Sequence, residues 1–128
     1  MVGQLPESLG DLPNLRILSI IYTGISGAIP ASLGKASKLE TLWLCFNQFS
    51  GEIPGELGEL PLEGLNLKGN NLTGNIPEGL TKMHTINRLY ITKNRFSGTI
   101  TSTVKTWLSG IQAYEINPQQ EGYGLTYN

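Results

Sequence analysis

The 128-residue sequence predicts a single α/β-type repeat solenoid, in which coils of about 24 residues stack and a parallel β-sheet forms one wall. Two observations support this fold class. The first is a tetrapeptide resembling Gly-x-Ile-Pro, which recurs every 23 or 24 residues and begins at Gly3, Gly27, Gly51, Gly74 and Gly98. The second is a block with the spacing L-x-x-L-x-L, which comes before each later copy, as in Leu39, Leu42 and Leu44.

Each leucine block predicts a short β-strand. Leu18 and Ile20 are two residues apart, so their side chains share one face of a strand. After about 24 residues the chain returns, and the next strand lies alongside at a distance of about 4.8 Å. No coil of this size buries its own apolar edge, so each coil needs neighbours. We therefore expect the ladder leucines to form the core, at about 1.5–3 kcal/mol for each fully buried side chain.

The turn that follows each strand predicts a ladder of inward-pointing amides. Asn47, Asn70 and Asn94 recur at one position of the frame, where a side-chain amide can bond backbone groups that have left the strand. Thr23 occupies this position in the first full coil. Because a hydroxyl has one donor and an amide has two, we expect the first coil to be looser.

The rest of each repeat predicts a corner and a return along the convex side. Glycine suits the sharp corner, and the proline that follows fixes φ, although Thr101 replaces proline in the last coil. After Ile116 the frame is lost, and residues 117–128 predict a turn-rich C-terminal cover. The domain thus comprises a partial N-terminal repeat, about four full repeats of 23–25 residues and this cover.

Composition excludes several classes of function. Only 15% of the residues are charged and the net charge is −1, which argues against binding to nucleic acid or to an acidic membrane surface. Cys45 is the single cysteine, and no spacing of Cys or His predicts zinc, so we expect no cofactor. The apolar stretch 17–22 is too short to insert into a membrane. No signal peptide follows Met1, and because the first residues already belong to a repeat, we expect the native chain to be longer.

The pattern L-x-x-L-x-L-x-x-N-x-L-x-G-x-I-P over residues 3–116 resembles the plant-specific subtype of leucine-rich repeats, found in receptor-kinase ectodomains and polygalacturonase-inhibiting proteins. The resemblance implies a right-handed curved superhelix with a concave parallel sheet and an irregular or 3-10 convex side. It also implies binding of other molecules at a cell surface or outside the cell. The paired cysteines that cap plant members are absent, and residues 116–120 resemble the ends of leucine-rich repeat surface proteins of gut bacteria, which favours a bacterial source.

Side chains that alternate with the ladder should point outward from the concave sheet and form a binding face. We expect an apolar, aromatic patch on the first two coils and a more basic region further along. The predicted face comprises Ile21, Tyr22, Trp43, Cys45, Phe46, Asn66, Lys68, Arg88, Tyr90 and Lys93. Exposed clusters rich in Trp, Tyr and Arg are typical of interaction sites. In the alternative interpretation, a further coil or the tail covers the aromatic residues.

Charge is distributed unevenly along the chain. Residues 1–67 hold three basic and seven acidic side chains, a net of −4, whereas residues 68–128 hold six and three, a net of +3. This asymmetry could orient a partner or favour end-to-end association. Solvated charges on unrelated faces explain it equally well.

Catalysis has one candidate pair of residues. Glu40 and Glu63 should lie on adjacent strands, at about the carboxylate spacing of a retaining glycosidase. An open sheet cannot exclude water, and no apolar wall is predicted that would raise one pKa. His84, the only histidine, falls in a convex loop. We therefore predict that the protein is not an enzyme and treat the two glutamates as solvated surface residues.

Together these features predict a non-catalytic module that binds another protein through its concave face. A glycan is a less favoured ligand. The main alternative is a structural spacer, or a fragment of a longer adhesin or receptor that binds through other coils. Cys45 on this face is either reactive or, as the stronger hypothesis, a small apolar filler.

Overall fold

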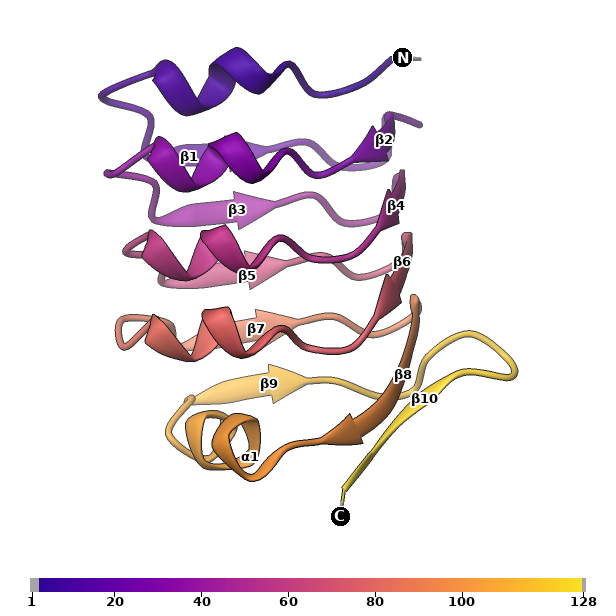
Figure 1. Ribbon diagram of the computed structural model, residues 1–128. Coiled ribbons are helices and arrows are strands. Elements are labelled where there is room, and N and C mark those ends of the chain that lie inside the picture. Colours follow the sequence, from indigo (N-terminus) through magenta and orange to yellow (C-terminus); the bar gives the residue numbers. More distant parts are fainter. Residues whose placement is uncertain (1–2, 128) are drawn as a thin grey trace.

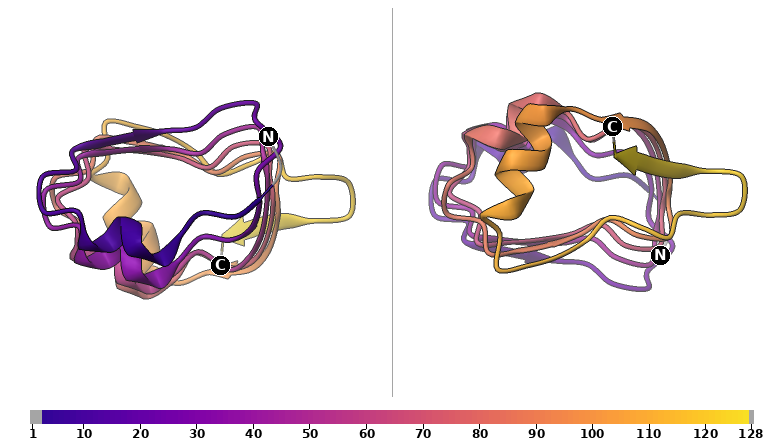
Figure 2. Two further views of the ribbon diagram at one scale, coloured as in Figure 1. Left: turned by 90° about the horizontal axis from the view of Figure 1, so that it is seen from above. Right: turned by 90° about the horizontal axis from the view of Figure 1, so that it is seen from below.

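The computed structural model describes residues 3–127, which form one stack of coils (Figure 1). Viewed along the stack, the coils overlie one another and enclose a flattened interior (Figure 2). Each full coil supplies a strand to one sheet, a second strand to another sheet and a helical turn between them. The solenoid predicted from the repeat is thus confirmed. No helix within the described residues is long and apolar enough to cross a membrane.

The first sheet is formed by the leucine blocks. Its five parallel strands follow chain order, and the ladder residues are in register, with Leu18 beside Leu42, Leu42 beside Leu65 and Leu65 beside Leu89. The strands are β1 (Ile17–Ser19), β3 (Thr41–Trp43), β5 (Gly64–Asn66), β7 (Arg88–Tyr90) and β9 (Ala113–Glu115). Each strand is only three residues long, so the alternation of inward and outward side chains extends over three residues only.

A second parallel sheet lies at the corner, where the sequence predicted only a sharp turn. Residues between the inward asparagine and the proline are extended, and they pair with the same segment of the next coil. The corner glycines still turn the backbone, with φ of 86° at Gly27 and 80° at Gly51. In spatial order the strands are β10 (Gly124–Tyr127), β8 (Arg95–Ile100), β6 (Asn71–Gly74), β4 (Gln48–Gly51) and β2 (Ser26–Ala28).

The convex side carries short 3-10 helices, as the family resemblance implied, until the last coil. These helices each follow a proline: η1 (Glu7–Asp11), η2 (Ala31–Lys35), η3 (Gly55–Glu59) and η4 (Glu78–Lys82). The last coil instead carries an α-helix, α1 (Ser102–Ser109). Thr101 stands where proline would be, and its hydroxyl accepts a bond from the Val104 N–H at 3.3 Å. A threonine at this N-cap satisfies an otherwise free helix N–H.

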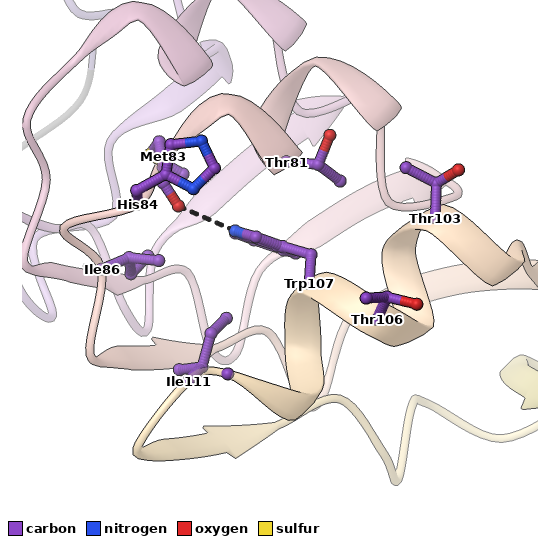
Figure 3. Close-up of a pocket in the computed structure, with 9 residues that line it drawn as sticks. Thr81, Met83, His84, Ile86, Thr103, Thr106, Trp107 and Ile111 are labelled. Carbon is purple, nitrogen blue, oxygen red and sulfur yellow. Dashed lines mark hydrogen bonds between the residues drawn. The ribbon is translucent and has the colours of Figure 1, made fainter.

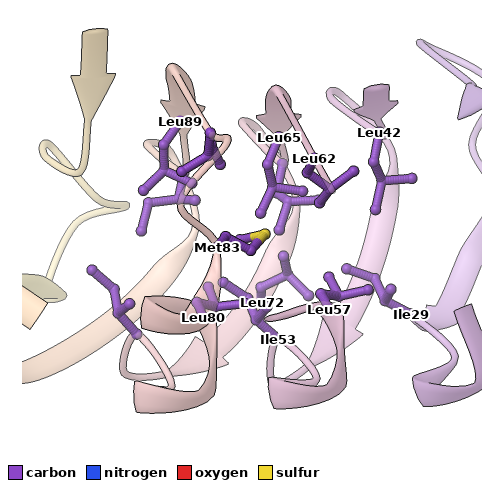
Figure 4. Close-up of a cluster of buried hydrophobic side chains, with 14 of the residues drawn as sticks. Ile29, Leu42, Ile53, Leu57, Leu62, Leu65, Leu72, Leu80, Met83 and Leu89 are labelled. Carbon is purple, nitrogen blue, oxygen red and sulfur yellow. The ribbon is translucent and has the colours of Figure 1, made fainter. Parts of the chain in front are cut away.

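Ladder side chains and convex leucines meet in the interior and form the core (Figure 4). Leu42, Leu65 and Leu89 are fully buried, because coils cover them on both sides. In the first full coil Leu18 is only partly buried. In the strand after α1, Tyr114 takes the ladder position but is 39% exposed, because residues 3–127 form no further coil over it. The pKa of Tyr127 is raised by burial and, to a smaller extent, by the neighbouring phenol of Tyr114.

Asparagine side chains link successive coils through the interior. The Asn70 amide nitrogen donates to the Leu44 and Leu67 carbonyls at 2.9 and 3.0 Å, and its oxygen accepts from the Phe49 N–H at 3.1 Å. Asn94 makes the same set of bonds one coil later. Because each amide bonds its own coil and the one before it, each rung satisfies buried backbone groups of two coils.

The C-terminal cover is built from a strand and a closed loop. Strand β10 pairs with β8, and the loop before it projects beyond the ring of coils (Figure 2). Asn117 closes this loop by donating to the Leu125 carbonyl at 2.8 Å and accepting from the Leu125 N–H at 3.1 Å. The sequence analysis predicted turns here but no strand. Strand β10 lies at the opposite end of the stack from β1 (Figure 1).

Candidate functional site

Two aromatic rings form a ledge beyond the ends of β1 and β3. The rings of Tyr22 and Phe46 stack with centroids 4.7 Å apart and planes 3° from parallel. Both residues have left-handed φ, 57° and 59°, because the chain turns inward at the next residue. In the third coil this position is Gly69, where a Cβ would lie 2.6 Å from the Phe46 ring. Because Gly69 has no side chain, the Phe46 ring can pack against its backbone. Tyr22 is 73% exposed.

A hollow of about 230 Å³ lies on the concave sheet beside Trp43. The indole nitrogen would be 3.4 Å from a Cβ added at Gly64, so the ring lies next to a position on β5 that has no side chain. Trp43 is 41% exposed. The hollow is lined by Thr41, Trp43, Glu63, Gly64, Asn87 and Arg88, which lie on or next to β3, β5 and β7.

Opposite charges flank this indole without pairing. Within residues 3–127 the one salt bridge is Lys82 to Glu59, 2.8 Å long, on the convex side. The carboxylate of Glu63 and the guanidinium of Arg88, both exposed, therefore keep their hydrogen-bonding capacity for a ligand. Asn87 adds an amide that both donates and accepts.

The remaining predicted face residues lie around these two features. Ile21 is exposed at the ledge end, and Lys93 is exposed with a φ of 58°. Asn66, Lys68 and Tyr90 are half-buried, and the Asn66 oxygen accepts from the Lys68 N–H at 3.1 Å. The structure thus stacks Tyr22 on Phe46, and it places Trp43 of the expected aromatic patch and Arg88 of the expected basic region along one hollow.

Cys45 does not belong to the exposed face, in contrast to the sequence prediction. Its side chain is only 5% exposed. Strand β3 ends at Trp43, so alternation does not extend to residue 45, and the Asn47 amide bonds the Cys45 carbonyl at 3.3 Å. Burial raises the pKa of the thiol, opposed by a backbone hydrogen bond and by the charge of Lys68. The thiol therefore acts as a small buried group, and a raised pKa disfavours reactivity.

Sequence reasoning left four of the six residues of the hollow out of the predicted face: Thr41, Glu63, Gly64 and Asn87. Each lies at the first position of its strand or directly before it. Of the lining residues at these positions, only Arg88 had been assigned to the predicted face. The signal was present in the sequence. Gly64 occupies an outward position where the neighbouring coils carry Thr41 and Arg88, so a gap beside Trp43 could have been predicted.

The two candidate catalytic glutamates do not share the hollow. The N–H of Glu63 donates to the backbone carbonyl of Glu40 at 2.7 Å, so their backbones are adjacent as expected. Only Glu63 lines the hollow beside Trp43. Within the described residues, no cluster of three or more His, Cys, Asp or Glu side chains could hold a metal ion.

Comparison with known proteins agrees with the repeat pattern. A family model described as Leucine Rich Repeat matches residues 38–60 and 61–83. No curated protein matches the sequence. With its parallel strands, stacked leucines and 3-10 turns, the chain is a leucine-rich repeat protein.

Solved structures with this fold include proteins of different function. The structure of PEPR1-AtPEP1 is 36% identical with a TM-score of 0.86, covering 91% of this chain and 16% of that one. A second structure is that of the Arabidopsis receptor kinase HAESA in complex with the peptide hormone IDA and the co-receptor SERK1. It is 30% identical with a TM-score of 0.80, and the match covers 99% of this chain and 20% of that one. A plant ice-binding protein is 28% identical with a TM-score of 0.81, and the match covers 93% of this chain and 38% of that one.

The chain therefore spans a minor part of each of these proteins, and the fold alone does not specify a ligand. The ligand has to be argued from the concave side chains. The bacterial source suggested by the C-terminal sequence stays a prediction, since these structures do not address it.

Proposed function

We propose that this protein is a non-catalytic recognition module that binds an extended segment of a partner protein across its concave face, at a cell surface or outside the cell. The observation that carries the proposal is the hollow beside Trp43, which offers an aromatic surface together with an unpaired acid, an unpaired base and an amide. The extracellular location rests on the resemblance of the repeat to receptor ectodomains.

The chemistry of the hollow suits a peptide main chain. An extended peptide presents N–H donors and carbonyl acceptors. The Glu63 carboxylate accepts from an N–H, and the Arg88 guanidinium donates to a carbonyl. Trp43 then packs against a side chain, because tryptophan buries a large apolar area at low entropic cost. This arrangement recognises main chain and side chain together.

The ledge supplies a second anchor at the N-terminal end of the face. Tyr22 is held by its stack on Phe46, and its other ring face is open. Both anchors sit on short hydrogen-bonded strands or on the turns directly after them, so little ordering is needed on binding. The HAESA complex with a peptide hormone supports this class of ligand on a related solenoid.

The proposal is tested by selecting binders from a displayed library of random linear peptides and measuring the Kd of the strongest. Trp43→Ala and Tyr22→Ala should each weaken that peptide at least about tenfold, the loss typical of a central interface residue. Tyr123→Ala is the matched control, because Tyr123 is an exposed aromatic residue in the C-terminal loop. Thermal melts of all variants establish that they fold.

Glu63→Gln and Arg88→Gln complete the test. Each should weaken the peptide severalfold, since each removes one charge-assisted hydrogen bond to the main chain. Selection of no peptide would favour a structural spacer and overturn the proposal. Equal affinity of the wild type and the Trp43 variant for the peptide would show that the peptide does not bind at the concave face, and would contradict the proposal.

A further inference from the structure

The convex side carries a groove of about 400 Å³ between the loop after η4 and helix α1 (Figure 3). Its polar rim is formed by Thr81, His84, Thr103 and Thr106, and Trp107 projects into it from α1. This groove faces away from the concave sheet and plays no part in the function proposed above.

A change in the repeat distinguishes this groove from the hollows that lie between the earlier convex helices. The convex helices of earlier coils approach through glycine, and a Cβ at Gly58 would lie 1.9 Å from the carbonyl oxygen of Gly79 in the next coil. Gly10 and Gly34 meet their neighbours in the same way. In the third full coil this position is Thr81. Thr81 thus carries a side chain where the earlier helices have only backbone, and it lines the groove together with Thr103 of α1.

Trp107 is fixed in the gap that results. Its indole N–H donates to the carbonyl of Met83 at 2.8 Å, which links α1 to the end of η4 (Figure 3). The donor is thereby satisfied, and the ring is held in one orientation while staying only partly buried. The indole is thus a preorganised flat surface, which lowers the entropic cost of binding a ligand.

The surface that a ligand could touch is aromatic at its centre and polar at its rim. The apolar floor residues Met83, Ile86 and Ile111 are only 2%, 6% and 7% exposed, so they offer little contact area. Thr103, Thr106 and His84 are exposed. No lining residue is an Asp, Glu, Lys or Arg, so the groove has no charged partner for an ionic ligand.

We infer that this groove binds a neutral saccharide, with one sugar ring stacked on Trp107 and its hydroxyls bonded to the threonine rim. A sugar ring has a flat face of C–H groups and an edge of hydroxyls, which matches an indole inside a ring of hydroxyl and imidazole groups. A hydrocarbon would leave the hydroxyl rim without partners, and a charged ligand would find no counter-ion. The volume is within the range of small-molecule sites.

The test uses the fact that the chain has only two tryptophans. In Trp43→Phe, fluorescence reports on Trp107 alone. Maltose, cellobiose and xylobiose serve as probes, and at least one should change the emission in a saturable way, with a Kd on the order of 1 mM. In the wild-type protein, the same sugar should shift the indole N–H NMR signal of Trp107 and leave that of Trp43 in place.

Rim variants decide whether the threonines bind the sugar. In the Trp43→Phe background, Thr103→Val and Thr106→Val keep the side-chain shape and remove the hydroxyl. Each should weaken the sugar about threefold to tenfold. Thr73→Val, on the exposed face of β6, should leave the Kd unchanged. Absence of a saturable signal with every sugar, or equal binding by the rim variants and wild type, would overturn the inference. Tighter binding of toluene than of any sugar would do the same.

Discussion

Gln119 completes the hydrogen-bonded ladder at the C-terminal end. Its side-chain oxygen accepts from the N–H groups of Asn94 at 3.0 Å and Phe96 at 3.4 Å. Its nitrogen donates to the carbonyls of Ile91 at 3.1 Å and Ile116 at 2.6 Å. These are the kinds of bond that Asn70 and Asn94 make in earlier coils. A glutamine amide thus serves as the last rung, where the chain leaves the repeat.

Replacing Gln119 should therefore destabilise the whole domain. In Gln119→Ala, three backbone groups lose their side-chain partner, while the Ile91 carbonyl keeps its bond from the Asn94 amide. A buried group left unsatisfied costs about 1–3 kcal/mol. Partial access of water at this end limits the loss, so we expect the free energy of unfolding to fall by about 2 kcal/mol in urea denaturation. Gln112→Ala is the matched control, because Gln112 is exposed. Equal stabilities of the two variants would show that the last rung contributes nothing.

At this scale the sequence predicted the polar ladder well but not its end. The position of Gln119 follows from the frame, because it lies three residues after Ile116, as Asn94 lies three residues after Ile91. Searching for asparagine alone missed it. Cys45 failed for another reason. Its burial depends on where β3 ends and the backbone turns, and a repeat pattern of apolar residues does not contain that boundary.

Among the elements, the convex helices depend on close backbone approach. The hypothetical Cβ at Gly58 would lie 1.9 Å from the Gly79 oxygen, far inside contact distance, and both groups belong to backbone that cannot move independently. Gly55, in the same helix η3, has no atom nearer than 3.9 Å to its hypothetical Cβ. Neither glycine has a positive φ, so the difference between them is one of space alone.

Gly58→Ala should destabilise the protein by at least about 2 kcal/mol, because overpacking must separate η3 from η4 or shift both. Gly55→Ala should leave stability unchanged or slightly higher, because alanine reduces the freedom of the unfolded chain. Urea denaturation of the two variants measures the difference. Similar midpoints would mean that the convex helices do not constrain the distance between coils.

Element-level prediction was accurate for the strands and incomplete elsewhere. Leucine spacing located the first sheet, since its period is fixed by packing. The second sheet was missed, because its pairing depends on backbone hydrogen bonds between extended segments and not on an apolar period. The α-helix of the last coil had a signal in Thr101, a good N-cap in place of proline. The groove likewise had a signal, in the replacement of glycine by Thr81.

For the whole molecule, burial is graded along the stack. The ladder residues of the second and third full coils, such as Leu44 and Leu67, are fully buried between neighbouring coils. In the first full coil Ile20 is only partly buried, and Thr23 replaces the inward asparagine. Ile17 and Leu12 are exposed at the same end. In a solenoid each coil is stabilised by its neighbours, so an end with less burial opens first.

Amide hydrogen exchange tests this gradient. The N–H groups of Ile20, Leu44 and Leu67 make bonds of nearly equal length to the next coil, 2.8, 2.9 and 2.8 Å, so bond geometry does not distinguish them. We expect the opening free energy at Ile20 to be about 1–2 kcal/mol below that at Leu44 and Leu67, because opening the first coil exposes less apolar surface. Gln119→Ala supplies the control, since it should lower protection at Asn94, whose N–H donates to the Gln119 side chain near the other end, and leave Ile20 unchanged. Equal protection at all three amides would instead show that the stack opens as one cooperative unit.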